Sequence, residues 1–163
     1  MKIAYADPPY INCAKYYPEK TEVDHRLLVD KLVNGYDNWA LSCSSPSLKQ
    51  LLDLCPDNVR IAAWVKPFCS FKPNVNPAYA WEPIIFSIKK QRLTRADRTI
   101  RDWVSANITL KKGLTGAKPI IFCYWLFDLL QMQPTDEFDD LFPGTGIVTK
   151  CWEEYRKGDV KKG

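Results

Sequence analysis

Short apolar runs alternate with amphipathic segments along most of the chain. Apolar runs bounded by turn-forming residues predict five strands, at 3–6, 39–43, 59–65, 84–88 and 138–142. Helical spacing of apolar residues, or a longer apolar segment, predicts four helices, at 21–34, 45–54, 120–132 and 147–155. The segment 66–83 holds four prolines and is predicted to be a rigid, irregular connector.

The order of these elements predicts the fold class. Strands and helices alternate at both ends of the chain, which favours a doubly wound, mostly parallel α/β sheet with helices on both faces. The 163 residues are expected to form a single domain over 1–163, without a separate second domain. No internal repeat or low-complexity tract interrupts the pattern.

Composition narrows the class of protein. The apolar segment 120–132 has 13 residues, too few for the roughly 20 that cross a bilayer. The first residues do not resemble a signal peptide, so we expect a cytoplasmic protein without membrane contact. Six cysteines lack a Cys-x-x-Cys pair and only one histidine is present, which predicts reduced, structural thiols and no metal site.

Positive charge is concentrated in one segment. The formal net charge is +4, and residues 89–112 hold eight basic side chains against two acidic ones. Such a segment either follows a phosphate backbone or forms a solvated loop. Charge alone leaves both interpretations open.

The strongest chemical signal follows the first strand, where Asp7-Pro8-Pro9-Tyr10 combines an acid, two prolines and an aromatic ring. The fixed φ of proline sets the direction of the carbonyls, Asp7 adds an acceptor, and Tyr10 adds a flat surface. Converging acceptors beside a ring suit a planar group with an exocyclic amine, whose lone pair they direct at an electrophile. The alternative is a structural Pro-Pro turn capped by Asp7.

A second signal follows the last predicted strand. The run 140–146 reads Asp-Leu-Phe-Pro-Gly-Thr-Gly and leads into a helix. Glycines allow the backbone to approach a ligand, and a helix N-terminus offers free N–H groups. A Gly-x-Gly turn alone is also common as a plain strand-to-helix connector. In open α/β sheets ligands bind beyond the carboxyl ends of the strands, where both motifs are predicted to lie.

The two motifs together resemble the permuted amino-methyltransferases of DNA and RNA that use S-adenosyl-L-methionine. DPPY at 7–10 resembles their catalytic motif and DLFPGTG at 140–146 their cofactor loop, as in small phage and bacterial adenine-N6 methylases and the mRNA adenosine methyltransferases. AKP at 117–119 and WEPIIF at 81–86 resemble further family elements. The resemblance covers nearly the whole chain and implies a permuted and shortened Rossmann-like fold of the class I methyltransferase type.

The resemblance also implies roles for single residues. The catalytic set is Asp7, Pro8, Pro9 and Tyr10. The cofactor set is Ala6, Asp7, Lys118, Asp140, Phe142, Pro143, Gly144, Thr145 and Gly146. Lys118 is expected to pair with the methionine carboxylate of the cofactor. Glu82 is expected either at the site or as a surface acid at the end of a strand.

Nucleic acid is the partner that the resemblance implies, with DNA favoured and RNA possible. Residues 89–112 and the loop with Tyr16 and Tyr17 are expected to flank the site, contacting phosphates and a neighbouring base. The phosphate contacts are assigned to Lys90, Arg92, Arg95 and Arg98. Neutralising the three arginines together should weaken binding and flatten its salt dependence.

The chain departs from the family at its end. Family members usually continue into another strand that supplies a polar residue for the cofactor ribose, and here only about a dozen residues follow Trp152. The primary prediction is an adenine-N6 methyltransferase, with cytosine N4 open as the target. The alternative is a methyltransferase-fold subunit that binds nucleic acid or cofactor without turnover, and a more distant one is a small-molecule enzyme of this fold. The last predicted strand is expected near a sheet edge, where a homodimer or partner subunit can pair.

Overall fold

A computed structural model describes residues 1–14, 21–69, 73–109 and 117–158 of the chain. Its centre is a six-stranded sheet with the order β5-β3-β4-β2-β1-β6. The strands are β1 (Lys2–Ala6), β2 (Asn38–Ser42), β3 (Arg60–Val65), β4 (Trp81–Ile88), β5 (Trp103–Ser105) and β6 (Glu137–Asp140).

Five of the six strands run in the same direction. β1 is parallel to both β2 and β6, and β3 is parallel to β5. β4 lies antiparallel between β2 and β3, so β3 and β5 regain the direction of β1. The carboxyl ends of β1, β2, β3, β5 and β6 therefore share one edge of the sheet, which we call the carboxyl edge.

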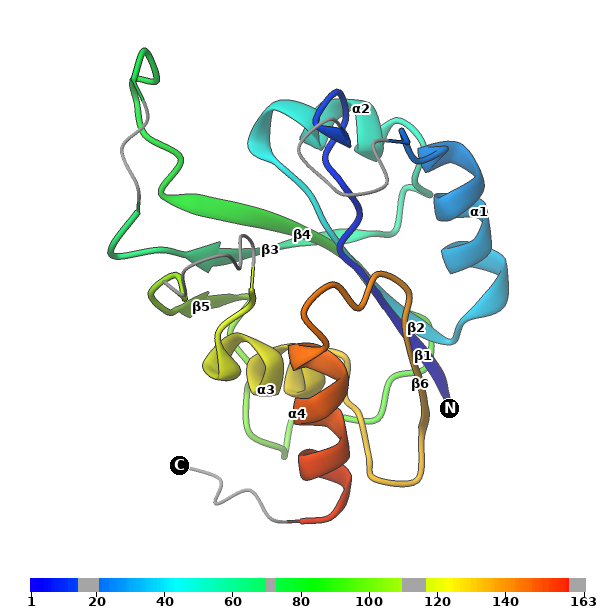
Figure 1. Ribbon diagram of the computed structural model, residues 1–163. Coiled ribbons are helices and arrows are strands. Elements are labelled where there is room, and N and C mark those ends of the chain that lie inside the picture. Colours follow the sequence, from blue (N-terminus) through cyan, green and yellow to red (C-terminus); the bar gives the residue numbers. More distant parts are fainter. Residues whose placement is uncertain (15–20, 70–72, 110–116, 159–163) are drawn as a thin grey trace.

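Helices cover both faces of the sheet (Figure 1). One face carries α1 (His25–Gly35) and α2 (Leu48–Leu52), which follows the 3₁₀ turn η2 (Ser45–Ser47). The other face carries α3 (Ile120–Leu129) and α4 (Ile147–Arg156). Among the described residues, none of these helices has the length and apolar character needed to cross a membrane.

Two apolar cores follow from this layering. Beneath α1 and α2, Leu28, Leu32 and Leu51 pack with Trp39 and Ile85 of the sheet. Beneath α3 and α4, a more aromatic core brings together side chains of both helices with the opposite face of the sheet. Its largest members are Tyr5, Trp64, Phe86, Phe122, Phe127 and Trp152. The six cysteines are free thiols, and three of them are buried.

The strand predictions were correct for five strands and missed one. β5 was missed because it has only three residues and lies in the charged segment. β4 begins at Trp81, three residues earlier than predicted, and includes Pro83. The Pro83 carbonyl accepts from the Cys43 N–H just beyond the end of β2, and the return bond to the Cys43 carbonyl is the one that a proline cannot make. Proline here costs only one hydrogen bond at the end of the β2–β4 pairing.

The helix predictions differ mainly at their ends. α1 begins after Asp24, whose carboxylate accepts from the Leu27 N–H, so the predicted start at Thr21 was wrong. The predicted helix 45–54 divides into η2 and the short α2. In α3, Ile120 and Ile121 of the first turn are exposed, whereas Phe122, Cys123, Leu126 and Phe127 are buried.

Candidate active site

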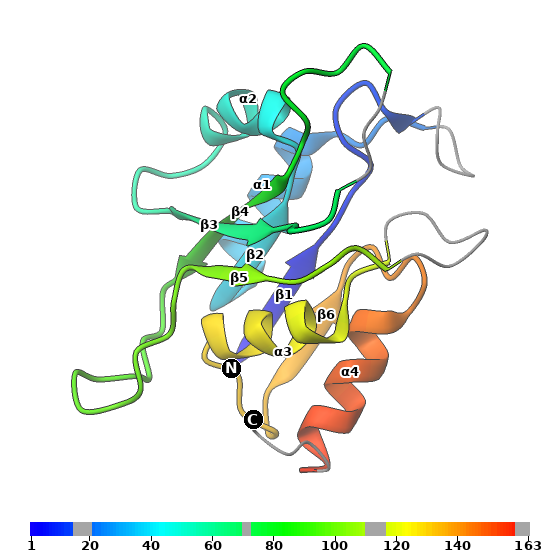
Figure 2. The ribbon, with the colours of Figure 1, turned by 90° about the vertical axis from the view of Figure 1, so that its left-hand side faces the viewer.

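The two sequence motifs lie side by side at the carboxyl edge. β1 and β6 are parallel neighbours, with Tyr5 aligned with Asp140. The Leu141 N–H donates to the Tyr5 carbonyl at 2.9 Å, which extends the pairing past the end of β6. Residues about 135 positions apart are thereby fixed in one place (Figures 1 and 2). The predicted convergence of the two ends is present.

The DPPY motif leaves the sheet directly after β1. Pro8 is buried, while Asp7, Pro9 and Tyr10 are partly exposed. The Cys13 N–H donates to the Tyr10 carbonyl at 2.8 Å and closes a turn after the motif. The motif therefore presents the Asp7 carboxylate at the carboxyl edge on a backbone that two prolines stiffen.

Lys118 connects Asp7 to Glu82 of β4, which β2 separates from β1. It lies just before α3, and its ammonium is 2.9 Å from Asp7 Oδ2 and 2.8 Å from Glu82 Oε1. Lys118 and Glu82 are each only 5% exposed. The ammonium also lies over the Trp64 ring, 5.4 Å from its centroid. Glu82 is thus part of the site and not a surface acid.

Lys66 completes this network and was not predicted from the sequence. Its ammonium lies 3.0 Å from Glu82 Oε2 and 4.4 Å from the centroid of the Trp64 ring. It follows β3 and belongs to the segment interpreted as an irregular connector. The pairing of Trp64 with Glu82 across β3 and β4 brings Lys66 to the site. Four charged groups of alternating sign form one chain from Lys66 through Glu82 and Lys118 to Asp7.

The pKa values of Glu82, Lys118 and Asp7 are all shifted in this network. Burial opposes ionisation of Glu82, but the charges and hydrogen bonds of Lys118 and Lys66 outweigh it and lower its pKa to about 2. Burial likewise opposes charge on Lys118, yet Asp7 and Glu82 raise its pKa above the ordinary value. Burial raises the pKa of Asp7, with Lys118 acting against that shift. Asp7 is therefore the carboxylate of the network that protonates most readily.

The lowered pKa of Glu82 predicts a pH-dependent contribution to stability. Its contribution is present above the ordinary glutamate pKa of 4.5 and is lost as the pH falls towards about 2. Glu82→Gln should therefore flatten the dependence of the unfolding free energy on pH between these values, as measured by urea denaturation. An unchanged slope in that interval would contradict the ion network, and Glu153→Gln on α4 is the matched control.

The glycine turn has the backbone that a ligand loop requires. Gly144 and Gly146 have φ of +48° and +73°, in the left-handed region that favours glycine. Apart from atoms of Gly146 itself, its chain neighbours and the adjoining helix backbone, no heavy atom of the described residues lies within 4 Å of the position that a Cβ at Gly146 would occupy. Gly146 is also the N-cap of α4 and brings no side-chain cap, so the turn opens onto a helix N-terminus. Pro143 and Thr145 are partly or largely exposed beside it.

Asp140 anchors this turn. Its Oδ2 accepts from the Thr149 hydroxyl at 2.9 Å, which ties the end of β6 to the first turns of α4. Its Oδ1 is buried without a hydrogen-bond partner among the described residues. The backbone N–H groups of Phe142 and Thr149 also act on the Asp140 carboxylate and lower its pKa, which offsets part of the cost of burying this acceptor. Burial raises the pKa of Asp140.

Three predicted cofactor residues are placed differently from the others. Ala6 is fully buried in the core beneath α1 and α2, and its role in cofactor binding stays a prediction. Phe142 packs partly against the same core and is half-buried. Lys118 already has two carboxylate partners, which conflicts with its expected pairing to a cofactor carboxylate.

The first part of the basic segment, with Lys90 and Arg92, does not flank the site as predicted. The Lys90 backbone pairs with the Asn38 side chain at the start of β2, and the Arg92 guanidinium pairs with Asp136 just before β6. Both therefore lie at the edge opposite to Asp7, where the connection after β4 extends away from the sheet (Figure 2). The antiparallel direction of β4 is the physical reason. Tyr16, Tyr17, Lys111 and Lys112 lie outside the described residues.

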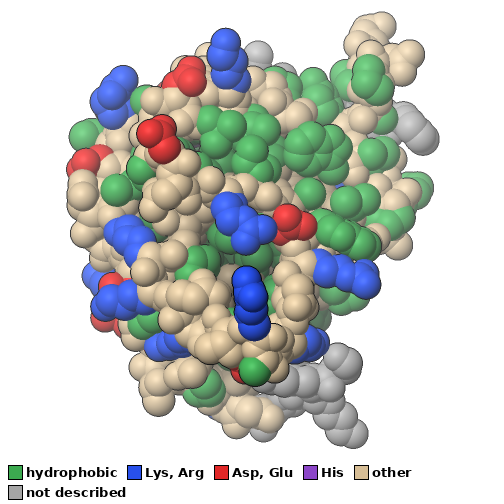
Figure 3. Space-filling model, turned by 180° about the vertical axis from the view of Figure 1, so that it is seen from behind, with side chains coloured by type: hydrophobic (Ala, Val, Ile, Leu, Met, Phe, Trp, Pro, Cys, Tyr) green, Lys and Arg blue, Asp and Glu red, His purple; other side chains and the backbone are tan. Residues whose placement is uncertain are grey.

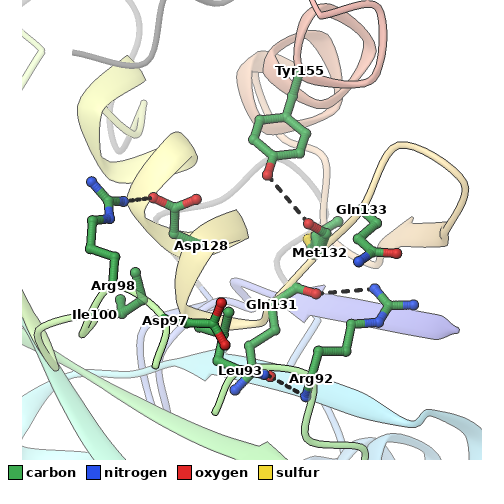
Figure 4. Close-up of a pocket in the computed structure, with 10 residues that line it drawn as sticks. All are labelled: Arg92, Leu93, Asp97, Arg98, Ile100, Asp128, Gln131, Met132, Gln133 and Tyr155. Atoms are coloured by element: carbon green, nitrogen blue, oxygen red, sulfur yellow. Dashed lines mark hydrogen bonds and ion pairs between the residues drawn. The ribbon is translucent and has the colours of Figure 1, made fainter. Parts of the chain in front are cut away.

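Three of the four predicted phosphate ligands have protein partners. Lys90 pairs with Asp37 at 2.8 Å, and Arg98 pairs with Asp128 of α3 at 2.6 Å. Arg92 and Arg98 line a hollow of about 500 Å³ between the loop after β4 and the ends of α3 and α4 (Figure 4). Arg95 is exposed. Binding of nucleic acid by these four residues stays a prediction.

Arg92 is expected to be a stabilising residue. Asp136 is fully buried and accepts from Arg92, from the Met1 ammonium and from the Gln133 N–H. These partners lower the Asp136 pKa, against burial, to about 2. Arg92→Ala should lower the unfolding free energy by about 2 kcal/mol, whereas the exposed Arg95→Ala should change it by less than about 0.5 kcal/mol. Urea denaturation measures both, and equal effects would contradict this role.

The comparisons with known proteins give a match only at the level of structure. No protein-family model matches the chain, and no curated protein matches it. Among solved structures, the chain is similar to the crystal structure of the M1.HpyAVI–SAM complex. The TM-score is 0.64 at 16% identity, over 95% of this chain and 78% of that one. The chain has the fold of M1.HpyAVI.

A second crystal structure of M1.HpyAVI supports the same statement. It matches with a TM-score of 0.61 at 17% identity, over 94% of this chain and 76% of that one. Together with the six-stranded, mostly parallel sheet, these matches confirm the predicted methyltransferase-like α/β fold. At such identities the likeness concerns the fold alone.

Proposed function

We propose that the protein is an S-adenosyl-L-methionine-dependent methyltransferase that acts on the exocyclic amine of a nucleobase, with adenine N6 in DNA as the favoured target. The observation that carries the proposal is the juxtaposition of the Asp7–Tyr10 motif and the 140–146 turn on the paired strands β1 and β6. The fold that the chain shares with M1.HpyAVI, solved as a SAM complex, supports this proposal.

The amine would be held by the DPPY motif. The Asp7 carboxylate has two oxygens with several lone pairs, so it can accept from an amine N–H while it remains paired with Lys118. The Pro8 carbonyl is the second proposed acceptor, and Tyr10 is the proposed stacking surface. Two acceptors that hold the N–H groups would direct the nitrogen lone pair out of the ring system, which is catalysis by positioning and electrostatics.

The cofactor would be held by the turn after β6. The glycines leave room for close backbone approach, the N-terminus of α4 offers N–H groups, and the unpaired Asp140 Oδ1 offers a buried acceptor. When bound, S-adenosyl-L-methionine supplies an electrophilic methyl group on a sulfonium. The residues present fit such a group. Gly144, Gly146 and Asp140 carry this part of the proposal.

Lys118 is proposed to position Asp7 in place of pairing with the cofactor. Its ammonium already contacts Asp7 and Glu82, and Lys66 neutralises the other oxygen of Glu82. The four charges sum to zero, so the network has no net positive charge left for a third carboxylate. Lys118 therefore favours the ionised form of Asp7, against the effect of burial, and orients the carboxylate that would accept from the amine.

Expression in a host that lacks adenine methylation tests the proposal. Total DNA and RNA are digested and the methylated nucleosides are measured by mass spectrometry. We expect N6-methyladenine in the DNA of cells with the natural chain and none with Asp7→Ala. Detection of N4-methylcytosine would assign cytosine as the target base. Methylation found only in RNA would assign RNA as the substrate.

The absence of any methylated nucleoside would contradict the enzyme proposal. A calorimetric titration of the purified chain with S-adenosyl-L-methionine then separates the remaining possibilities. Cofactor binding without turnover would identify the binding subunit considered from the sequence.

A further inference from the structure

At the β3–β5 end, one face of the sheet is not covered by a helix of the described residues. Ile61, Ala63 and Val65 lie on the same face of β3, because alternate residues of a strand point to the same side. Trp103 of β5 is aligned with Ala63, and Trp81 of β4 is aligned with Val65. Directly paired residues share a face, so both indoles lie beside the Ile61–Val65 row. We call Ile61, Val65, Trp81 and Trp103, with Arg101, the aromatic face.

No helix covers this face within the part of the chain that the structure describes. The core beneath α1 and α2 reaches Ile85 of β4, which is aligned with Ile61, but contains no residue of β3 or β5. Trp81 and Trp103 are consequently 42% and 44% exposed, and Ile61 and Val65 are exposed as well. The view from behind shows hydrophobic side chains gathered broadly on the surface (Figure 3). Two exposed indoles on a sheet face indicate a binding surface.

The chemistry of the face favours nucleic acid. The Arg101 guanidinium lies 5.4 Å from the centroid of the Trp103 ring, which places a cation among the aromatic rings. Phe68 and Tyr79, in the connection between β3 and β4, are also exposed. Flat rings interspersed with cations bind unpaired nucleotides, because each base can stack and each phosphate meets a positive charge. The net charge of +4 acts in the same direction.

The aromatic face adjoins the candidate site. Trp81 directly precedes Glu82, and Val65 directly precedes Lys66. Since successive residues of a strand point to opposite faces, the ion network and the aromatic face are two sides of the same strand ends. A polymer that delivers one base to Asp7 would pass over the carboxyl edge of the sheet to bring further nucleotides onto this face.

We propose that the aromatic face binds unpaired nucleotides beside the target base, and therefore that the substrate is a single-stranded nucleic acid. The inference rests on the proposed function and deepens it. Bases inside a duplex have no free faces to stack on Trp81 and Trp103, whereas bases in a single strand do. A second copy of this chain is the other possible occupant and is an outcome of the test.

Binding without cofactor tests this inference. A fluorescein-labelled single-stranded oligonucleotide and its duplex are titrated with the full chain, and anisotropy is followed. We expect the single strand to bind at least about 10-fold more tightly than the duplex. Trp81→Ala and Trp103→Ala should each weaken single-strand binding by about 5- to 150-fold, the range for loss of one stacked base. Trp81→Phe should keep most of the affinity, because it keeps a ring.

Leu27→Ala is the matched control, because Leu27 is an exposed apolar residue of α1 on a different part of the molecule. Unchanged affinity in both tryptophan variants would overturn the inference, as would tighter binding of the duplex. Sedimentation of the protein alone is measured in parallel. If the natural chain is a dimer and the tryptophan variants are monomers, the aromatic face binds a second copy of the chain. That result would also overturn the inference.

The outcome is separable from that of the proposed function. If the tryptophan variants bind normally while Asp7→Ala abolishes methylation, the aromatic face is excluded and the methyltransferase proposal stands. If the tryptophan variants lose binding but no methylation is found, the aromatic face binds single strands and the methyltransferase proposal is excluded. Circular dichroism of each variant shows that the fold is intact.

Discussion

Replacing Asp7 with alanine is expected to reduce methyl transfer by at least about 10²- to 10³-fold, the usual cost of removing one preorganised polar contact to a reacting group. The carboxylate lies at the carboxyl edge, held by Lys118 and by the turn that Pro8 and Pro9 stiffen. Without it the amine would lose an acceptor and its orientation. The measurement is the rate of transfer of a labelled methyl group from cofactor to nucleic acid by the purified chain.

Two further variants test whether the rate of methyl transfer depends on the acceptor oxygens of Asp7. Asp7→Asn keeps one acceptor oxygen and should lie between the natural chain and Asp7→Ala. Asp57→Ala removes an exposed carboxylate that follows α2 and should change the rate by less than about 2-fold. A rate for Asp7→Ala within about 3-fold of the natural chain would exclude Asp7 from the reaction.

Replacing Lys118 with methionine is expected to lower the unfolding free energy by about 3–5 kcal/mol, the usual cost of breaking a buried ion pair from one side. Lys118 is 5% exposed and lies between two carboxylates at 2.9 and 2.8 Å. Methionine fills a volume similar to that of lysine, so the loss of unfolding free energy would reflect the missing charge more than a change in packing. Urea denaturation measures it.

A double variant separates two causes of the stability loss: the lost attraction of the ion pair, and the cost of a buried carboxylate left without a partner. In Lys118→Met with Glu82→Gln, the buried carboxylate that lost its partner is also neutralised, so part of the stability should return. Lys49→Met on the exposed side of α2 is the matched control and should change stability by less than about 0.5 kcal/mol. A loss below about 1 kcal/mol for Lys118→Met would show that the ion network carries little of the stability.

The parts of the site that the sequence predicted are those where residue type and local order decide the structure. An acid and two prolines after a strand, and a glycine turn before a helix, are local signals. Alternation of strands and helices predicted parallel neighbours, so the adjacency of Asp7 and Gly144 followed from general rules of α/β sheets. The register of Tyr5 with Asp140 bears this out.

The parts that sequence reasoning missed depend on pairing between distant segments. Lys66 joined the site only because β4 runs antiparallel to β3 and aligns Glu82 with Trp64. The same reversal carried Lys90 and Arg92 to the far edge of the sheet. Charge composition gives no information about strand direction, so neither placement was predictable from the basic segment alone.

The account depends on the ends of β1 and β6 forming one site for the cofactor and the amine. A crystal structure with S-adenosyl-L-homocysteine, the product of methyl transfer, tests this most directly. We predict that the ligand contacts the turn around Gly144 and Gly146, and that its sulfur faces the Asp7–Tyr10 motif. A ligand bound away from that turn, for example in the hollow beside Arg92 and Tyr155, would contradict the account.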